Sequence, residues 1–346
     1  MFCRRVRYHF FLLTFACLAS ALSAHASLGV LVGEPYGSFG TMLPVGHTAL
    51  YFDKICANSP TDLRPCIPGE QGVVVARYHR IANLDWLATP IVPFLYGVDD
   101  PSVAPAYVTP ETATELREHY RQTHLESIVP GRLDAAGNDL PARKGEWTET
   151  IGAAFDRRLL LYEFDTTPEQ DAALLAWLRA RPDRRRYSLR RANCADFTAE
   201  AVNLLYPGTI RRNRLADFGM MTPKQNARSL EAFGLAHPEL HLRVYEIPQL
   251  PGTLRRSRPL RGAAETFVKT KRYLTFFLVT QPELALADWI IYENKGRWRP
   301  TTAATSLGPT SWSNPPSGIA QTNDPSLSDS PASSPPLVSV SPGALP

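Results

Sequence analysis

The segment that most restricts the fold is an amphipathic helix expected over residues 193–206. Asn193 is a good N-cap, and Tyr206-Pro207-Gly208 ends the helical pattern. Cys194 falls in the first turn, where unpaired N–H groups and the positive end of the helix dipole favour a thiolate. A helix of this kind must pack its apolar face on another layer, and that face carries Phe197, Ala201, Leu204 and Leu205.

Two interpretations of Cys194 stay open from this segment alone. The thiol is either a nucleophile or a buried cysteine that acts as a small apolar residue. A basic stretch precedes it and would lower the pKa of the thiol if the side chains point toward it. These arginines either bind an anionic group, with Arg190 and Arg191 as the candidate substrate contacts, or form a solvated face. The stretch contains Arg179, Arg181, Arg184, Arg185, Arg186, Arg190 and Arg191.

Residues 1–26 have the features of a secretory signal peptide. Three arginines precede an apolar run, and Ala24-His25-Ala26 is a suitable cleavage site. The whole chain carries a net charge of +4, and the segment holds three arginines and no acid, so the mature protein is near +1. We therefore expect a periplasmic or secreted protein, with membrane association left open and no nucleic-acid partner.

Removal of the signal leaves three of the five cysteines. Cys56 and Cys66 are ten residues apart in one loop, and an exported chain permits disulfides. We expect these two to form a disulfide and Cys194 to remain free. The alternative is that all three stay reduced and inert.

Two early segments predict neighbouring strands. The run 45–52 is rich in β formers, and His47 at its start shares a face with Ala49 and Tyr51. The run 72–81 is a second strand that could pair with it. A histidine at a strand start is either a polar edge residue or a catalytic base.

The rest of the chain completes an α+β organisation. We expect helices over 109–126, 167–181 and 222–233 and strands over 158–164 and 242–247. Residues 84–96 form a packed loop or an exposed apolar lip, because Pro90 and Pro93 argue against a regular helix. Residues 267–292 form a strand or helix followed by a second helix, with contact to a membrane surface possible. The domains predicted are a signal peptide (1–26), one main domain (27–235), a C-terminal extension (236–298) and a disordered Pro/Ser-rich tail (299–346).

Several common enzyme classes lack their motifs here. The sequence has no G-x-S-x-G, H-E-x-x-H, C-x-x-C or P-loop pattern. His119 and His124 are five residues apart, which is not metal-ligand spacing. We therefore expect no metal and no cofactor.

What remains is a possible thiol site. A cysteine nucleophile needs a base and a group that orients the base. His47 is the candidate base and His79 the candidate orienting group, with Tyr78 as the substitute if the strand register is shifted by one residue. The N–H groups near Cys194 and Ala195 could stabilise an oxyanion.

The order of these residues resembles the circularly permuted papain-like thiol hydrolases. This group includes lecithin:retinol acyltransferase-like enzymes and is related to NlpC-type cell-wall peptidases. The similar segments are Gly46 to Phe52 (GHTALYF) and Asn193 to Phe197 (NCADF). The second segment is also similar to the Lnb-type periplasmic lipoprotein N-acyltransferase family. The resemblance implies an antiparallel sheet packed on the cysteine helix, and a thioester acyl-enzyme that transfers its acyl group to water or an amine.

Three functions follow as hypotheses. The first is an exported thiol acyltransferase or hydrolase that acts on a lipid or lipoprotein, with Cys194, His47 and His79 as catalytic residues and Tyr78, Asn193, Arg190 and Arg191 at the substrate. The second is a peptidoglycan amidase or peptidase of the same fold, which would need a deep polar groove. The third is a cell-envelope module without catalytic activity, in which His47 and Cys194 lie apart.

Overall fold

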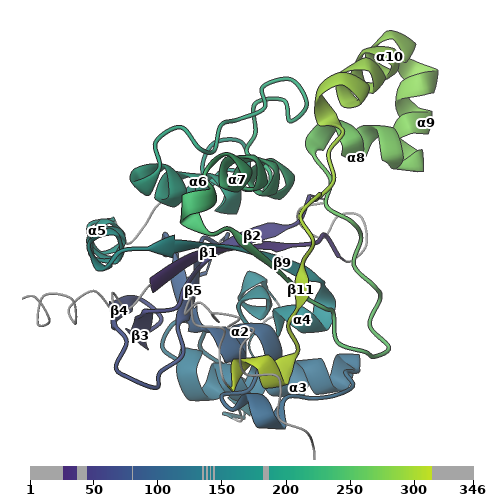
Figure 1. Cartoon of the computed structure of the whole chain (residues 1–346). Coiled ribbons are helices and arrows are strands. Elements are labelled where there is room, and N and C mark those ends of the chain that lie inside the picture. The colour runs from purple at the N-terminus through teal and green to yellow at the C-terminus, as the bar shows by residue number, and fades with distance from the viewer. Residues whose placement is uncertain are drawn as a thin grey trace, which may run out of the picture.

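A seven-stranded sheet organises the molecule. A computed structural model describes residues 26–36, 45–79, 81–134, 136–137, 139–140, 142, 145–181 and 187–313. Within that part of the chain the strand order is β11-β10-β9-β1-β2-β5-β6 (Figure 1). All neighbours are antiparallel except β10 and β11, which are parallel. The strands are β1 (Ala26–Gly33), β2 (His47–Phe52), β5 (Val73–Ala76), β6 (Leu87–Pro90), β9 (Leu159–Thr166), β10 (Arg243–Ile247) and β11 (Thr305–Ser306).

Helices cover both faces of this sheet (Figure 1). Leu50 and Phe52 of β2 belong to the core on one face, and Ala49 and Tyr51 to the core on the other, because successive side chains alternate. The first face is covered by α5 (Pro168–Arg179), α6 (Cys194–Leu205) and α7 (Pro223–Ala236). The second face is covered by α2 (Ile91–Tyr96), α3 (Pro110–Tyr120) and α4 (Ala153–Asp156). The fold is thus a mixed α+β arrangement with an antiparallel-rich sheet, as expected.

The helix starts follow their capping residues. Asn193 caps α6 through a reciprocal pair of hydrogen bonds with Asp196, and Thr167 caps α5 in the same way with Gln170. Thr222 caps α7. These caps satisfy N–H groups that have no acceptor inside the helix, so the predicted start of each helix lies within a residue of the observed one.

Two expectations near β5 were wrong. The strand expected over 72–81 ends at Ala76. Most of 84–96 is neither a loop nor a lip, because residues 87–96 form β6 and the buried helix α2. Pro93 is compatible with that helix because it stands in the first turn, where its missing N–H would have no intrahelical acceptor.

Short elements connect the main ones. A hairpin of β3 (Ile55–Ser59) and β4 (Asp62–Pro65) follows β2, and β7 (Arg132–Leu133) pairs with β8 (Asp139–Leu140). Single helical turns are η1 (Pro101–Val103), η2 (Arg121–Leu125), η3 (Glu146–Thr150), η4 (Pro238–Leu240), η5 (Tyr292–Gly296) and η6 (Pro309–Trp312).

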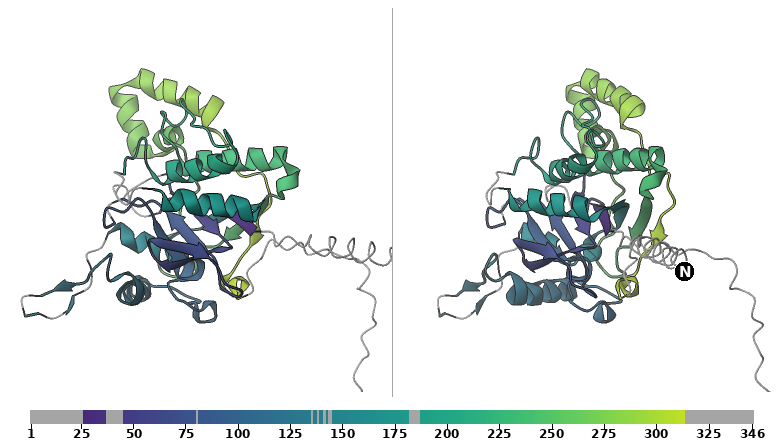
Figure 2. Two further views of the ribbon diagram at one scale, coloured as in Figure 1. Left: turned by 90° about the vertical axis from the view of Figure 1, so that its left-hand side faces the viewer. Right: turned by 60° about the vertical axis from the view of Figure 1, so that its left-hand side comes forward.

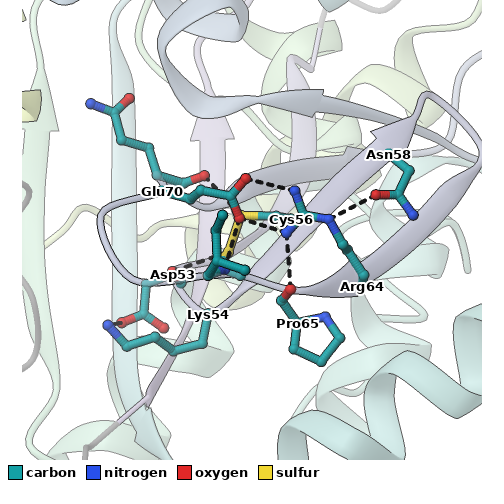
Figure 3. Close-up of a disulfide and its surroundings, with 10 residues drawn as sticks. Asp53, Lys54, Cys56, Asn58, Arg64, Pro65 and Glu70 are labelled. Carbon is teal, nitrogen blue, oxygen red and sulfur yellow. Dashed lines mark hydrogen bonds and ion pairs between the residues drawn. A yellow bond between two sulfur atoms is a disulfide. The ribbon is translucent and has the colours of Figure 1, made fainter.

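The β3–β4 hairpin carries the predicted disulfide. Cys56 and Cys66 are bonded (Figure 3). Cys194 is a free cysteine. Arg64 beside them binds both carboxylate oxygens of Glu70, at 2.5 and 2.6 Å. Cys56, Cys66 and Glu70 lie close enough together to hold an ion. However, both sulfurs are in the disulfide and Glu70 is paired, so this group does not fit a metal.

Three helices project from one end of the molecule. They are α8 (Ala263–Lys269), α9 (Lys271–Thr280) and α10 (Pro282–Ile291), and all views place them away from the sheet (Figures 1 and 2). The sequence predicted a strand or helix and then a second helix here, and both segments are helical. In the part of the chain that the structure describes, no helix is both long and apolar enough to cross a membrane.

The tail prediction was wrong for its first residues. The segment 299–313 was expected to be disordered, yet β11 pairs with β10 and Trp312 is fully buried. The ring of Trp312 meets Tyr51 edge to face at 6.0 Å. A single large aromatic residue can dock on a preformed core despite a polar local composition. Residues 1–25 of the proposed signal, and 314–346, lie outside the described residues.

Candidate functional site

Cys194 is the first residue of α6 and faces the start of β2. The N–H and hydroxyl of Thr48 and the N–H of Ala195 lie near its Sγ and act to lower the pKa of the thiol. Oγ1 of Thr198, one helical turn further on, lies 3.2 Å from Oγ1 of Thr48 and 3.1 Å from the carbonyl oxygen of Cys194. Polar groups of α6 and β2 therefore meet at the sulfur.

The acidity of this thiol differs from the expectation. Burial raises the pKa of Cys194 to about 11, although the Thr48 and Ala195 donors act to lower it. The thiol is only 2% exposed, and the loss of water disfavours the thiolate more than the helix start favours it. The predicted lowering of the pKa was therefore wrong, and the thiol is neutral at neutral pH.

His47 immediately precedes Thr48, so its peptide unit reaches the sulfur, but its ring lies on the other side of the strand. There it lines a small cavity with Ala49, Glu149 and Arg157. Its Nε2 is buried and has no hydrogen-bond partner in the described part of the chain. Burial lowers the pKa of His47 to about 4, with Glu149 acting to raise it and Arg157 to lower it. The imidazole is therefore neutral at neutral pH.

Tyr78, rather than His79, faces the His47 ring. The two rings are stacked, with centroids 5.0 Å apart and planes at 18°. Arg77, the residue before Tyr78, points to the opposite face, where its guanidinium lies over the ring of Phe197 and pairs with buried Asp85 at 2.8 Å. Successive side chains point to opposite faces, so Tyr78 lies on the same face as the His47 ring. This is the position expected for Tyr78 if the strand register is shifted by one residue.

His79 contacts a different set of residues. Its Nδ1 lies 3.2 Å from the carboxylate of Glu146, and its ring centroid lies 5.3 Å from that of Tyr187. His79 comes three residues after the end of β5, so it is not on the strand beside His47. Its role in orienting His47 stays a prediction.

Glu149 and Arg157 are functional candidates that the sequence did not reveal. They form a buried ion pair at 2.8 Å beside His47. Burial acts to raise the pKa of Glu149, but the Arg157 guanidinium holds it below its ordinary value, so the carboxylate is charged. No local pattern marks these residues, because they come from η3 and the approach to β9, about 100 residues from His47 in sequence.

The predicted substrate contacts next to Cys194 divide into two kinds. The Asn193 amide is engaged by protein groups: Oδ1 accepts from Asp196 at 2.9 Å, and Nδ2 donates to carbonyl oxygens of Leu189 at 2.7 Å and Met221 at 3.0 Å. It thus holds the start of α6 in place. Arg190 and Arg191 are exposed on the preceding turn and are not among the residues that line the Cys194 pocket. Arg184, Arg185 and Arg186 lie outside the described residues.

An apolar pocket of about 150 Å³ opens at Cys194. Its wall includes Leu189, Met220, Met221, Pro223, Phe267 and Tyr273. A second cavity of about 290 Å³ lies among α8, α9 and α10, and Phe267 lines this cavity as well. Asp288 also lines the second cavity, and burial raises the pKa of its carboxyl to about 6. The surroundings of the thiol on this side are therefore largely apolar.

Comparison with known proteins gives little beyond this geometry. The chain matches no protein-family model, and it matches no curated protein. A solved structure of the type VI secretion system effector TseH is similar over 64% of this chain and 98% of its own, at 13% identity and a TM-score of 0.29. A TM-score this low does not establish a common fold, so the likeness says nothing about function.

Proposed function

We propose that this protein is an exported, cysteine-dependent acyl-transfer enzyme with a permuted papain-like arrangement. The observation that carries the proposal is a free thiol at a helix start, beside Thr48 and in the wall of an apolar pocket. Cys194 attacks the carbonyl carbon of an ester or amide, and a thioester forms as the alcohol or amine leaves. Water or an amine then takes the acyl group, which gives a hydrolase or an acyltransferase.

His47 is the proposed base. Both partners are neutral at neutral pH, since the pKa of Cys194 is raised to about 11 and that of His47 is lowered to about 4. The proton must therefore leave Sγ as the sulfur attacks and reach the leaving group, and the His47 ring, which lines the cavity on the other side of the strand, would have to turn toward the sulfur to carry it. Nε2 of His47 has no partner in the described residues, which leaves it able to accept that proton. The Glu149 carboxylate beside the ring would stabilise the imidazolium.

The substrate class follows from the wall of the pocket. Apolar side chains favour the acyl chain of a lipid or lipoprotein, because each buried methylene contributes about 0.8 kcal/mol. A peptidoglycan amidase would need polar groups for sugars and peptides, and the Cys194 pocket has few. The Cys56–Cys66 disulfide fits an oxidising compartment, in keeping with the proposed export.

The test is a search for the acyl-enzyme. Mature protein incubated with an activated long-chain acyl ester should gain the mass of one acyl group on Cys194, and neutral hydroxylamine should remove it. Cys194→Ser should lose the hydroxylamine-sensitive adduct, and His47→Ala should slow its formation by about 10²- to 10⁴-fold, the usual effect of a general base. Thr48→Val should slow it too, whereas Thr48→Ser keeps the hydroxyl and serves as the matched control.

Two results would contradict the proposal. Equal acylation of wild type and His47→Ala would remove the base from the mechanism. Labelling that persists in Cys194→Ser at other nucleophiles, with no thioester in the wild type, would favour the envelope module without catalytic activity.

A further inference from the structure

Helix α10 is apolar apart from Glu283 and Asp288, yet it lies at the surface. Of its ten residues only Ala285 is buried, while Leu284, Leu286, Trp289 and Ile290 are each at least half exposed. A helix with so much apolar surface is normally enclosed by protein or by lipid. In the described part of the chain, protein encloses only one side of this helix.

The neighbouring helix extends the same surface. Phe276, Leu278 and Val279 of α9 are 54–78% exposed. We call the combined set the α9–α10 surface, defined by Phe276, Leu278, Val279, Leu284, Leu286, Trp289 and Ile290. It belongs to the helices that project furthest from the sheet (Figure 2). Apolar surfaces of this extent are uncommon on monomeric proteins and mark a site of contact.

The dimensions of these helices fit contact with the surface of a bilayer. Each has ten residues, which corresponds to about 15 Å, half of the roughly 30 Å of a bilayer core. Helices that do not span a bilayer can still bury apolar residues in the interface between lipid and water. Trp289 suits that depth, because its ring is apolar and its N–H can bond to water or headgroups.

The surface also borders a cavity that shares one wall residue with the Cys194 pocket. Leu284 is 55% exposed and at the same time lines the cavity among α8, α9 and α10. Phe267 lines both that cavity and the Cys194 pocket. A bilayer on this surface would place acyl chains at the mouth of the cavity, whereas a protein partner would cover the mouth. This argument rests on the proposed function; the exposure of the two helices does not.

We propose that the α9–α10 surface binds the protein to a lipid bilayer. Apolar insertion drives the binding, so it does not depend on the charge of the headgroups. The seven residues enter the interface while the sheet and α6 remain in water.

The experiment measures flotation with phosphatidylcholine vesicles, at low and high salt. The protein is the mature chain with Cys194→Ser, so that the result does not depend on catalysis. The test variant combines Phe276→Ser, Val279→Ser and Trp289→Ser, three exposed side chains that do not line the cavity. The matched control is Leu235→Ser, because Leu235 is 66% exposed on α7. Circular dichroism checks that each variant folds.

We expect the parent protein and Leu235→Ser to bind neutral vesicles at both salt concentrations. The triple variant should partition about a hundredfold less, because each half-exposed apolar side chain contributes roughly a factor of five. Equal binding by the triple variant, or no flotation of the parent, would overturn the proposal. A parent protein that forms a dimer and does not float, together with a triple variant that is monomeric, would also overturn the proposal. The α9–α10 surface would then be an interface between two copies of the protein.

Discussion

Alkylation of Cys194 as a function of pH tests the central electrostatic claim. The pKa of this thiol is raised from an ordinary 9.0 to about 11 by burial. Two pKa units correspond to about 2.7 kcal/mol, so at neutral pH the thiolate fraction should be about a hundredfold below that of an ordinary cysteine. The rate of reaction with iodoacetamide should therefore rise tenfold per pH unit up to about pH 11, without an earlier plateau.

Alkylation of the mature protein can be measured at a single cysteine. In a form that starts at Ser27, Cys3 and Cys17 are absent, and Cys56 and Cys66 are in their disulfide, so only Cys194 reacts. Mass spectrometry follows the adduct, and circular dichroism confirms the fold at each pH.

Thr48 supplies the internal comparison. Thr48→Val removes a hydroxyl that donates to the sulfur, which should raise the pKa of Cys194 by roughly another unit, because hydrogen bonds to charged groups contribute about 1.5–3 kcal/mol. Thr48→Ser should leave the profile unchanged. A plateau near or below the ordinary thiol pKa in the wild type would refute the reasoning, because it would mean that the helix start and the arginines outweigh burial.

Two further predictions concern stability. Trp312→Ala should lower the free energy of unfolding by about 3–5 kcal/mol in urea titrations, because it removes a fully buried aromatic side chain. Leu235→Ala, on the exposed face of α7, should change the free energy of unfolding little. Equal losses in the two variants would show that 299–313 does not dock on the core. The lowered pKa of His47, about 4 against an ordinary 6.5, means that the unfolded chain binds a proton more readily between these values. As pH falls from about 6.5 to about 4, the free energy of unfolding of the wild type should therefore fall by about 3 kcal/mol relative to that of His47→Phe. Above about pH 6.5 the difference between the two proteins should not change with pH. Parallel curves of unfolding free energy against pH would indicate that His47 is solvated.

Neighbouring residues were enough to predict the local features of the site. Asn193 and the apolar face of 193–206 specified α6, because capping and helical periodicity act within a few residues. The β-forming run after Gly46 specified β2 and the position of His47 on it. The spacing and compartment of Cys56 and Cys66 specified the disulfide. Each of these conclusions needed only neighbouring residues.

The contacts between these elements depend on the packing of segments that are distant in sequence. The burial that raises the pKa of Cys194 comes from layers distant in sequence, as does the contact between its sulfur and Thr48. The Glu149–Arg157 pair reaches His47 from η3 and the approach to β9, and Trp312 reaches Tyr51 from the end of the described chain. Only the fold showed that Tyr78 stacks on the His47 ring while His79 contacts Glu146 and Tyr187. Long-range packing sets solvent exposure and partners, and these determine acidity, so no short pattern could have revealed them.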